Sequence, residues 1–190
     1  MQILGSQLIG TPVMSLHTGA RVASLETPVI DPGTLTILAY SVQGPLLTEH
    51  PSFLRMADVR EFGHLGMIID DADEIVGLDD VLKIKEMYEL QFQLVGMSVI
   101  DEHKHKLGKI ADYTVEAGSF TVQKLQVRRG FFKSLNDTGL LIHRSQIVEI
   151  TRERIVVKAT AKPVVTEERE TPVAYDYVNP FRKPSAQPES

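Results

Sequence analysis

Residues 94–122 decide the fold and read Leu94-Val95-Gly96-Met97-Ser98-Val99-Ile100, then Leu107-Gly108-Lys109-Ile110-Ala111-Asp112-Tyr113, then Gly118-Ser119-Phe120-Thr121-Val122. Near the N-terminus the same pattern reads Leu8-Ile9-Gly10-Thr11-Pro12-Val13-Met14, then Val22-Ala23-Ser24-Leu25, then Gly33-Thr34-Leu35-Thr36-Ile37. A pattern that recurs within one chain predicts two copies of one structural unit.

The two copies align over most of their length. Residues 8–13 match 94–99 at an offset of 86, residues 22–37 match 107–122 at 85, and residues 53–69 match 141–157 at 88. In both copies the apolar alternation changes phase in mid-strand, after Ile37 and after Val122. Side chains of a strand alternate between its faces, so this change predicts a β-bulge at equivalent places.

Each copy holds about six short strands in roughly 70 residues, which predicts a small β-barrel or a pair of curled sheets. Asp79 and Asp80 precede a run of helix formers, which predicts a short connecting helix. The last thirty residues hold five of the ten prolines and no glycine, which favours disorder. We therefore predict an all-β chain with two tandem small barrels: a first domain at 1–77, a linker helix at 78–91, a second domain at 92–160 and a disordered tail at 161–190.

The charge is distributed unevenly along the 190 residues, whose formal net charge is -5. Residues 1–93 carry 5 basic and 13 acidic side chains, and residues 94–160 carry 11 basic and 7 acidic ones. Halves of opposite sign can attract each other or face different partners. The modest net charge argues against a nucleic-acid binder that uses its whole surface.

Several classes of chemistry have no support in the sequence. The absence of cysteine excludes disulfides, thiolate catalysis and cysteine-bound metal. There is no recognisable nucleophile motif and no glycine-rich phosphate loop, so we predict no enzyme and no cofactor. No apolar run approaches the roughly 20 residues that span a bilayer, and no leader opens the chain, so we expect a cytoplasmic protein without membrane insertion.

Two charged stretches are candidate metal sites. His103 and His105 lie two residues apart and would share one face of a strand. Neighbouring lysines would repel a cation, so a charged hairpin turn is the favoured interpretation. The acidic cluster Asp70-Asp71-Ala72-Asp73-Glu74 lacks the spacing and the glycine of a calcium loop, which favours an exposed acidic face. We predict no metal.

The best candidate surface is a stretch of basic and aromatic residues. It consists of Arg128, Arg129, Phe131, Phe132 and Lys133, with Gly130 between them. The phenylalanines could plug a barrel end, the mixture suits a protein interface, and basic groups beside aromatic rings also suit RNA. We rank these interpretations in that order.

The pattern Leu-Val-Gly-x-x-Val-Ile-Asp, Leu-Gly-Lys-Ile-x-Asp, Gly-x-Phe-x-Val and Ile-Val-Glu-Ile resembles the PRC-barrel family. That family includes a domain of the photosynthetic reaction centre's H subunit and one of the ribosome-maturation factor RimM. The resemblance implies a non-enzymatic module that binds other macromolecules. It predicts an adaptor with a protein partner, and the alternative is a factor associated with RNA or the ribosome through a basic face of the second copy.

Overall fold

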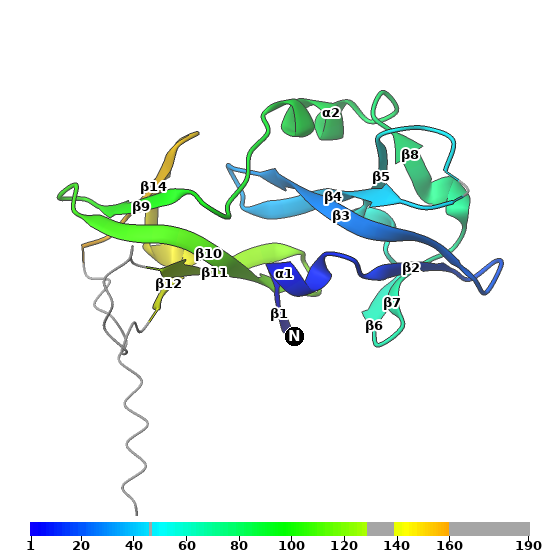
Figure 1. The fold of residues 1–190 in the computed structure, drawn as a ribbon, viewed down its shortest axis with the longest axis horizontal. Helices are drawn as coiled ribbons and strands as arrows, with labels where there is room; N and C mark the ends of the chain where they lie inside the picture. The colour runs from blue at the N-terminus through cyan, green and yellow to red at the C-terminus, as the bar shows by residue number, and fades with distance from the viewer. Residues whose placement is uncertain (46, 129–138, 160–190) are drawn as a thin grey trace, which may run out of the picture.

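A computed structural model describes residues 1–45, 47–128 and 139–159 of the chain (Figure 1). The first half contains β1 (Gln2–Leu4), α1 (Gly5–Leu8), β2 (Pro12–Ser15), β3 (Arg21–Asp31), β4 (Thr36–Gln43), β5 (Ser52–Arg55), η1 (Met56–Asp58), β6 (Glu61–Gly63), β7 (Gly66–Ile69), η2 (Ala72–Glu74), β8 (Ile75–Gly77) and α2 (Leu82–Glu89). The second half contains β9 (Ser98–Asp101), β10 (Lys106–Glu116), β11 (Thr121–Arg128), β12 (Leu140–His143), η3 (Arg144–Gln146), β13 (Ile147–Ile150) and β14 (Arg154–Val157). The described chain is therefore mostly strand, as predicted.

The sequence repeat is a structural repeat. The strands pair in the order β6-β7-β2-β3-β4-β5 in the first half and β13-β14-β9-β10-β11-β12 in the second. In each half one parallel pair joins otherwise antiparallel strands: Val13 pairs with Met67, and Val99 pairs with Ile155. The offsets of 86 and 88 read from the sequence relate these two pairs. The repeat therefore preserves strand register as well as strand order.

The predicted bulges are present at equivalent places. The pairing of β3 with β4 skips Leu38, and the pairing of β10 with β11 skips Gln123, which lies 85 residues further on. Each extra residue reverses which face the following side chains occupy, so Tyr40 and Leu125 both enter the core after the bulge. The change of phase in the sequence is thereby confirmed.

The two halves do not form the two closed barrels that we predicted. The described strands form one sheet that ends at β13 and at β6, so the sheet is not closed into a barrel. The reason lies in the single turns η1 and η3, which follow β5 and β12. After these turns the chain forms β6 and β13, which pair with β7 and β14 rather than closing onto β5 and β12.

The halves meet through the turns of their long hairpins, β3-β4 and β10-β11 (Figure 1). Thr36 pairs with Thr121. The Ile37 N–H donates to the Phe120 carbonyl at 2.9 Å, and the Val122 N–H donates to the Leu35 carbonyl at 2.8 Å. Thr36 and Thr121 lie 85 positions apart, and the same offset relates Ile37 to Val122 and Leu35 to Phe120, so it interchanges the two hydrogen bonds. The junction is therefore a local two-fold relation within one chain, like the isologous interface of a symmetric dimer.

β1, which precedes the first half, covers part of the second half. α2, which precedes the second half, covers part of the first half. β1 pairs with β10, and the Met1 ammonium lies 2.7 Å from a Glu116 carboxylate oxygen. α2 packs against the first half, where Ile84 is buried and the Tyr88 ring meets the Phe53 ring edge-on at 5.2 Å. Because the main core cluster holds residues of both halves, the two copies share one hydrophobic core. None of the helices in the described ranges has the length and apolar character needed to span a membrane.

Candidate functional site: a groove at the junction of the repeats

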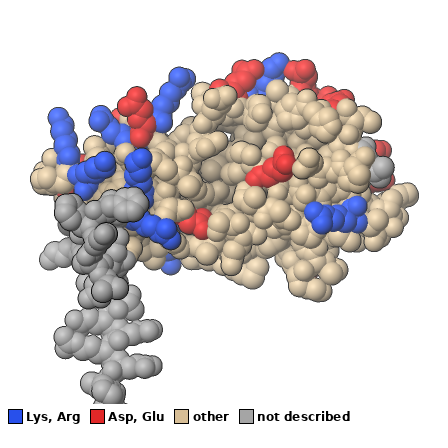
Figure 2. Space-filling view, in the orientation of Figure 1, with Lys and Arg blue, Asp and Glu red and all other residues tan. Residues whose placement is uncertain are grey.

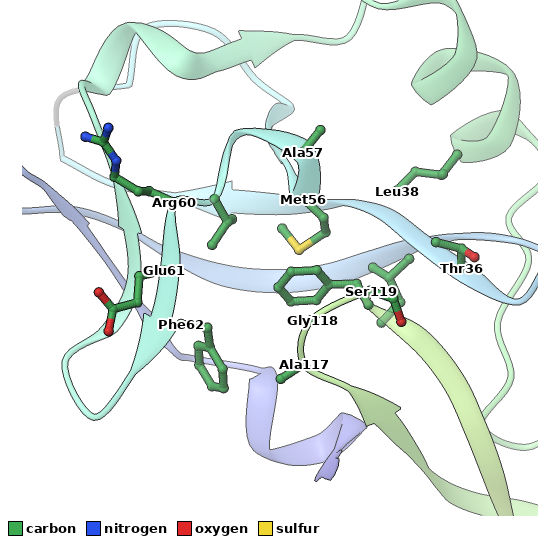
Figure 3. A pocket seen from close by; sticks show the side chains of 13 residues that line it. Thr36, Leu38, Met56, Ala57, Arg60, Glu61, Phe62, Ala117, Gly118 and Ser119 are labelled. Carbon is green, nitrogen blue, oxygen red and sulfur yellow. The ribbon is translucent and has the colours of Figure 1, made fainter. Parts of the chain in front are cut away.

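A groove of about 690 Å³ opens where the two halves meet, and we call it the junction groove (Figure 3). One wall is the β10-β11 turn of the second half, residues 117–120. The other walls come from the first half: the start of β4, the turn η1 and the edge strand β6. The groove exists because the two hairpin turns pair, so both halves are needed to build it.

The groove combines an apolar floor with a polar rim. Ile37, Met56 and Phe120 are buried beneath it, and Phe62 is half-buried at its side. Glu61 and Arg60 lie exposed along β6 and just before it. The Arg60 guanidinium is engaged by Asp70. A concave apolar surface with a few polar groups is typical of a binding site.

The local two-fold relation produces a second groove, the mate groove, of about 330 Å³. Its walls are the β3-β4 turn, residues 32–35, together with Arg144 and strand β13. These segments are equivalent to 117–120, Met56 and β6 at the offsets of 85 and 88. The same architecture therefore appears twice with different side chains.

A side chain of the protein itself lies in the mate groove. The Arg144 guanidinium Nη2 donates to the Thr34 carbonyl at 3.0 Å. The equivalent position beside the junction groove is Met56, and the carbonyl equivalent to that of Thr34 belongs to Ser119. The Ser119 carbonyl accepts one hydrogen bond from the Thr121 hydroxyl at 3.3 Å, and a carbonyl oxygen has capacity for two.

Of the predicted surface stretch, the structure describes Arg128, which is not among the residues that line the junction groove. Arg128 ends β11 and is exposed. Arg129, Phe131, Phe132 and Lys133 lie outside the described residues, as does the tail that we predicted to be disordered. Exposed lysines and arginines do gather over the second half, at the left of Figure 2.

The two histidines lie in the turn between β9 and β10, and both are exposed. Asp101 organises this turn: its carboxylate accepts from the backbone N–H groups of His103 and His105 at 2.9 and 2.8 Å, and lies 2.9 Å from His105 Nδ1. Partial burial works against the charged form, but these hydrogen bonds outweigh it and lower the pKa of Asp101. Within the described ranges, no three potential ligands gather into a metal site.

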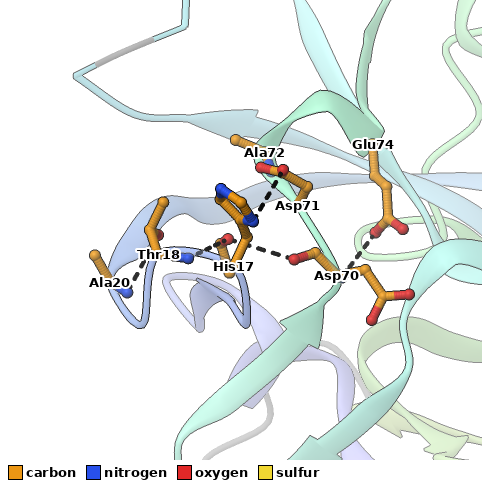
Figure 4. A network of polar contacts seen from close by, with 8 residues as sticks. His17, Thr18, Ala20, Asp70, Asp71, Ala72 and Glu74 are labelled. Atoms are coloured by element: carbon orange, nitrogen blue, oxygen red, sulfur yellow. Dashed lines mark hydrogen bonds and ion pairs between the residues drawn. The ribbon is translucent and has the colours of Figure 1, made fainter.

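The acidic cluster is built into the fold around η2 (Figure 4). The Asp71 carboxylate caps η2 by accepting from the Ala72 N–H at 2.6 Å, and it lies 3.9 Å from His17 Nδ1. The Asp70 N–H donates to the Glu74 carboxylate at 3.2 Å. These contacts tie the β2-β3 turn to η2, so the cluster has a structural role.

Comparison with known proteins finds a family match in the second copy. The PRC-barrel domain family matches residues 87–163, which confirms the resemblance to that family read from the second copy. A solved structure of a putative 16S ribosomal RNA processing protein RimM from Pseudomonas aeruginosa is similar at 17% sequence identity. The match covers 83% of this chain and 97% of that chain with a TM-score of 0.29. No curated protein matches the chain.

Sequence reasoning missed the junction groove, although one signal was present. Gly33 and Gly118 occupy equivalent turns at the offset of 85, and these turns form the walls of the two grooves. The sequence did not show that the turns pair with each other.

Proposed function

We propose that this protein is a non-enzymatic interaction module, an adaptor, that binds a protein partner in the junction groove. The observation that carries the proposal is the contrast between equivalent grooves: Arg144 lies in one of them, and the other is about twice as large. A groove that the chain could fill by one substitution, but leaves open, is suited to an external side chain.

The composition of the groove supports this proposal. Protein interfaces concentrate their binding free energy in aromatic and aliphatic residues at a desolvated centre with a polar rim. Phe120 and Phe62 supply the aromatic surface, and Glu61 and Ser119 supply the rim. The PRC-barrel match over the second copy is compatible with a binding module, as the resemblance implies.

The test adds bulk at a residue that lines the groove and has room for a side chain. A Cβ added at Gly118 meets no atom within 4 Å, so the turn has room for Gly118→Leu, which adds an apolar side chain to a residue that lines the junction groove. Gly33→Leu makes the same change in the mate groove, where the added Cβ meets only an Asp31 carboxylate oxygen, at 3.3 Å. Each tagged full-length variant is used to capture proteins from the native lysate after ribonuclease treatment.

The wild-type protein and Gly33→Leu should retain the same set of proteins through ribonuclease, and Gly118→Leu should lose it. A set that Gly118→Leu retains in full would contradict the proposed site. Capture of no protein by the wild type would contradict the adaptor function.

A second candidate function, RNA binding, rests on the basic face of the second half (Figure 2). Lys104, Lys106, Lys109 and Arg128 are all exposed there. RNA bound through phosphates should dissociate steeply as salt rises, and Arg128→Glu combined with Arg129→Glu should abolish binding. Fluorescence anisotropy with a labelled single-stranded RNA at several salt concentrations measures both effects, and an affinity independent of salt and of this pair would contradict RNA binding.

A further inference from the structure

We propose that the junction groove binds an arginine side chain of the protein partner. This inference rests on the proposed function and names what the groove recognises. In the bound state the guanidinium donates to the Ser119 carbonyl, and the aliphatic stem lies over the apolar floor.

The mate groove supplies the pattern for this interaction. There the Arg144 side chain lies beside the β3-β4 turn and donates to the Thr34 carbonyl at 3.0 Å. The β10-β11 turn presents the Ser119 carbonyl at the equivalent position, but η1 begins with the shorter Met56. The backbone acceptor therefore occurs at equivalent positions in both turns, and an arginine donates to it in the mate groove.

The junction groove is better suited than its mate to a guanidinium from outside. Phe120 replaces the equivalent Leu35, and Phe62 replaces the equivalent Ile150, so two aromatic rings line the junction groove. A planar guanidinium stacks on aromatic faces and gains a cation–π attraction there. Figure 3 shows Phe62 and Met56 from the first half facing the turn that carries Gly118 and Ser119.

An exposed carboxylate on the rim favours a basic partner. The first half, which forms most of the groove, carries 13 acidic and 5 basic side chains up to residue 93. Glu61 is exposed on the rim, and no ion pair to it is found among the described residues. The Glu61 carboxylate attracts a cationic side chain to the rim before the short-range contacts form.

The probe is a capped Val-Arg-Val tripeptide, titrated into the isotope-labelled full-length protein and followed by amide NMR shifts. The matched control is Val-citrulline-Val, which keeps the shape of arginine and removes its charge. The arginine peptide should saturate shifts at Ser119 and Phe120 in the millimolar range. The citrulline peptide should bind at least about fivefold more weakly, because it lacks the charge that drives cation–π attraction.

Two variants exchange the side chains at the equivalent positions of the two grooves. Met56→Arg places an arginine where the mate groove has one, and it should abolish the peptide-induced shifts at Ser119 and Phe120. Arg144→Met removes the arginine from the mate groove and frees the Thr34 carbonyl, and it should add peptide-induced shifts at Thr34 that the wild type lacks. Arg144 is half-buried rather than in the core, so this second variant remains informative if Met56→Arg fails to fold.

The outcomes separate this inference from the proposed function. Equal affinity for the arginine and citrulline peptides, or shifts confined to residues outside both grooves, would overturn the arginine assignment. If Gly118→Leu still abolishes capture from the lysate, the adaptor function stands and only the arginine is wrong. Concentration-dependent self-association that Met56→Arg abolishes, without peptide binding, would show a second copy as the occupant and overturn the inference.

Discussion

Gly5 lies against the face of a buried tyrosine from the other half. A Cβ built on Gly5 would approach atoms of the Tyr113 ring to 2.5 Å, and Tyr113 is only 3% exposed. Burial and the neighbouring Asp112 carboxylate raise the pKa of Tyr113 to about 12, which keeps its hydroxyl neutral at physiological pH. The glycine is therefore required by close packing between the N-terminal segment and β10.

We predict that Gly5→Ala lowers the free energy of unfolding by about 1–3 kcal/mol, because overpacking forces the ring or the backbone to shift. Gly118→Ala is the matched control, since its added Cβ meets no atom within 4 Å. Urea unfolding of the two variants measures the difference. Equal stability of Gly5→Ala and the wild type would show that the N-terminal segment does not pack on Tyr113.

The Asp101 carboxylate gives a prediction with a defined pH dependence. Its hydrogen bonds with His105 and His103 lower its pKa in the folded state, although burial opposes the shift. A lowered pKa contributes stability at pH values above the unfolded value of 3.8, and that contribution is lost as the pH falls through the lower folded value. Asp101→Asn should therefore be less stable than the wild type at neutral pH, and the gap should narrow below about pH 4.

Urea unfolding at neutral and at acidic pH measures that gap. Glu86→Gln, an exposed carboxylate on α2, is the control that should show little effect at either pH. A gap between Asp101→Asn and the wild type that stayed constant with pH would mean that the carboxylate charge does not hold the turn.

At the level of the elements, local pattern predicted most of the structure. The phase changes after Ile37 and Val122 predicted bulges that the strand pairing confirms, because a bulge leaves its mark on nearby residues. The helix expected after Asp79 and Asp80 begins at Leu82. The prediction of closed barrels was wrong, because closure depends on which distant strand edges pair. The turns η1 and η3 direct β6 and β13 to other partners.

Helix α2 offers a prediction with its control on the same element. Ile84 is 3% exposed against Val29, Ala39 and Phe53, whereas Leu82 is 72% exposed. Ile84→Ala should cost about 2–4 kcal/mol of unfolding free energy through lost burial and a residual cavity. Leu82→Ala should stay within about 0.5 kcal/mol of the wild type. Thermal unfolding compares them, and similar costs would show that α2 does not pack on β3 and β5.

At the level of the whole molecule, the sequence revealed two copies but not how they join. The junction pairs Thr36 with Thr121 and places Leu35 and Phe120 at φ of 54° and 49°, a region that side chains seldom adopt. Long-range packing decides that β4 pairs with β11, and no local sequence pattern indicates this pairing. The junction groove follows from it, so the candidate site could not be located before the fold was known.

The partner-binding stretch read from the sequence stays a prediction. Arg128 is exposed at the end of β11, which suits a role in binding, and the rest of that stretch lies outside the described residues. The junction groove and Arg128 lie on different parts of the molecule, because Arg128 pairs with Lys109 at the far end of the β10-β11 hairpin. Variants of the two sites should therefore affect binding independently.

The most direct test of the two-fold junction is amide hydrogen exchange, followed by NMR, at Ile37 and Val122. Each N–H donates to a carbonyl of the other half, at 2.9 and 2.8 Å, so both should be strongly protected and to a similar degree. The exposed Ser119 amide in the same turn should exchange faster, since its N–H bonds only within the turn, to Glu116 at 3.3 Å. Rapid exchange at either Ile37 or Val122 would contradict the pairing of the halves and, with it, the junction groove.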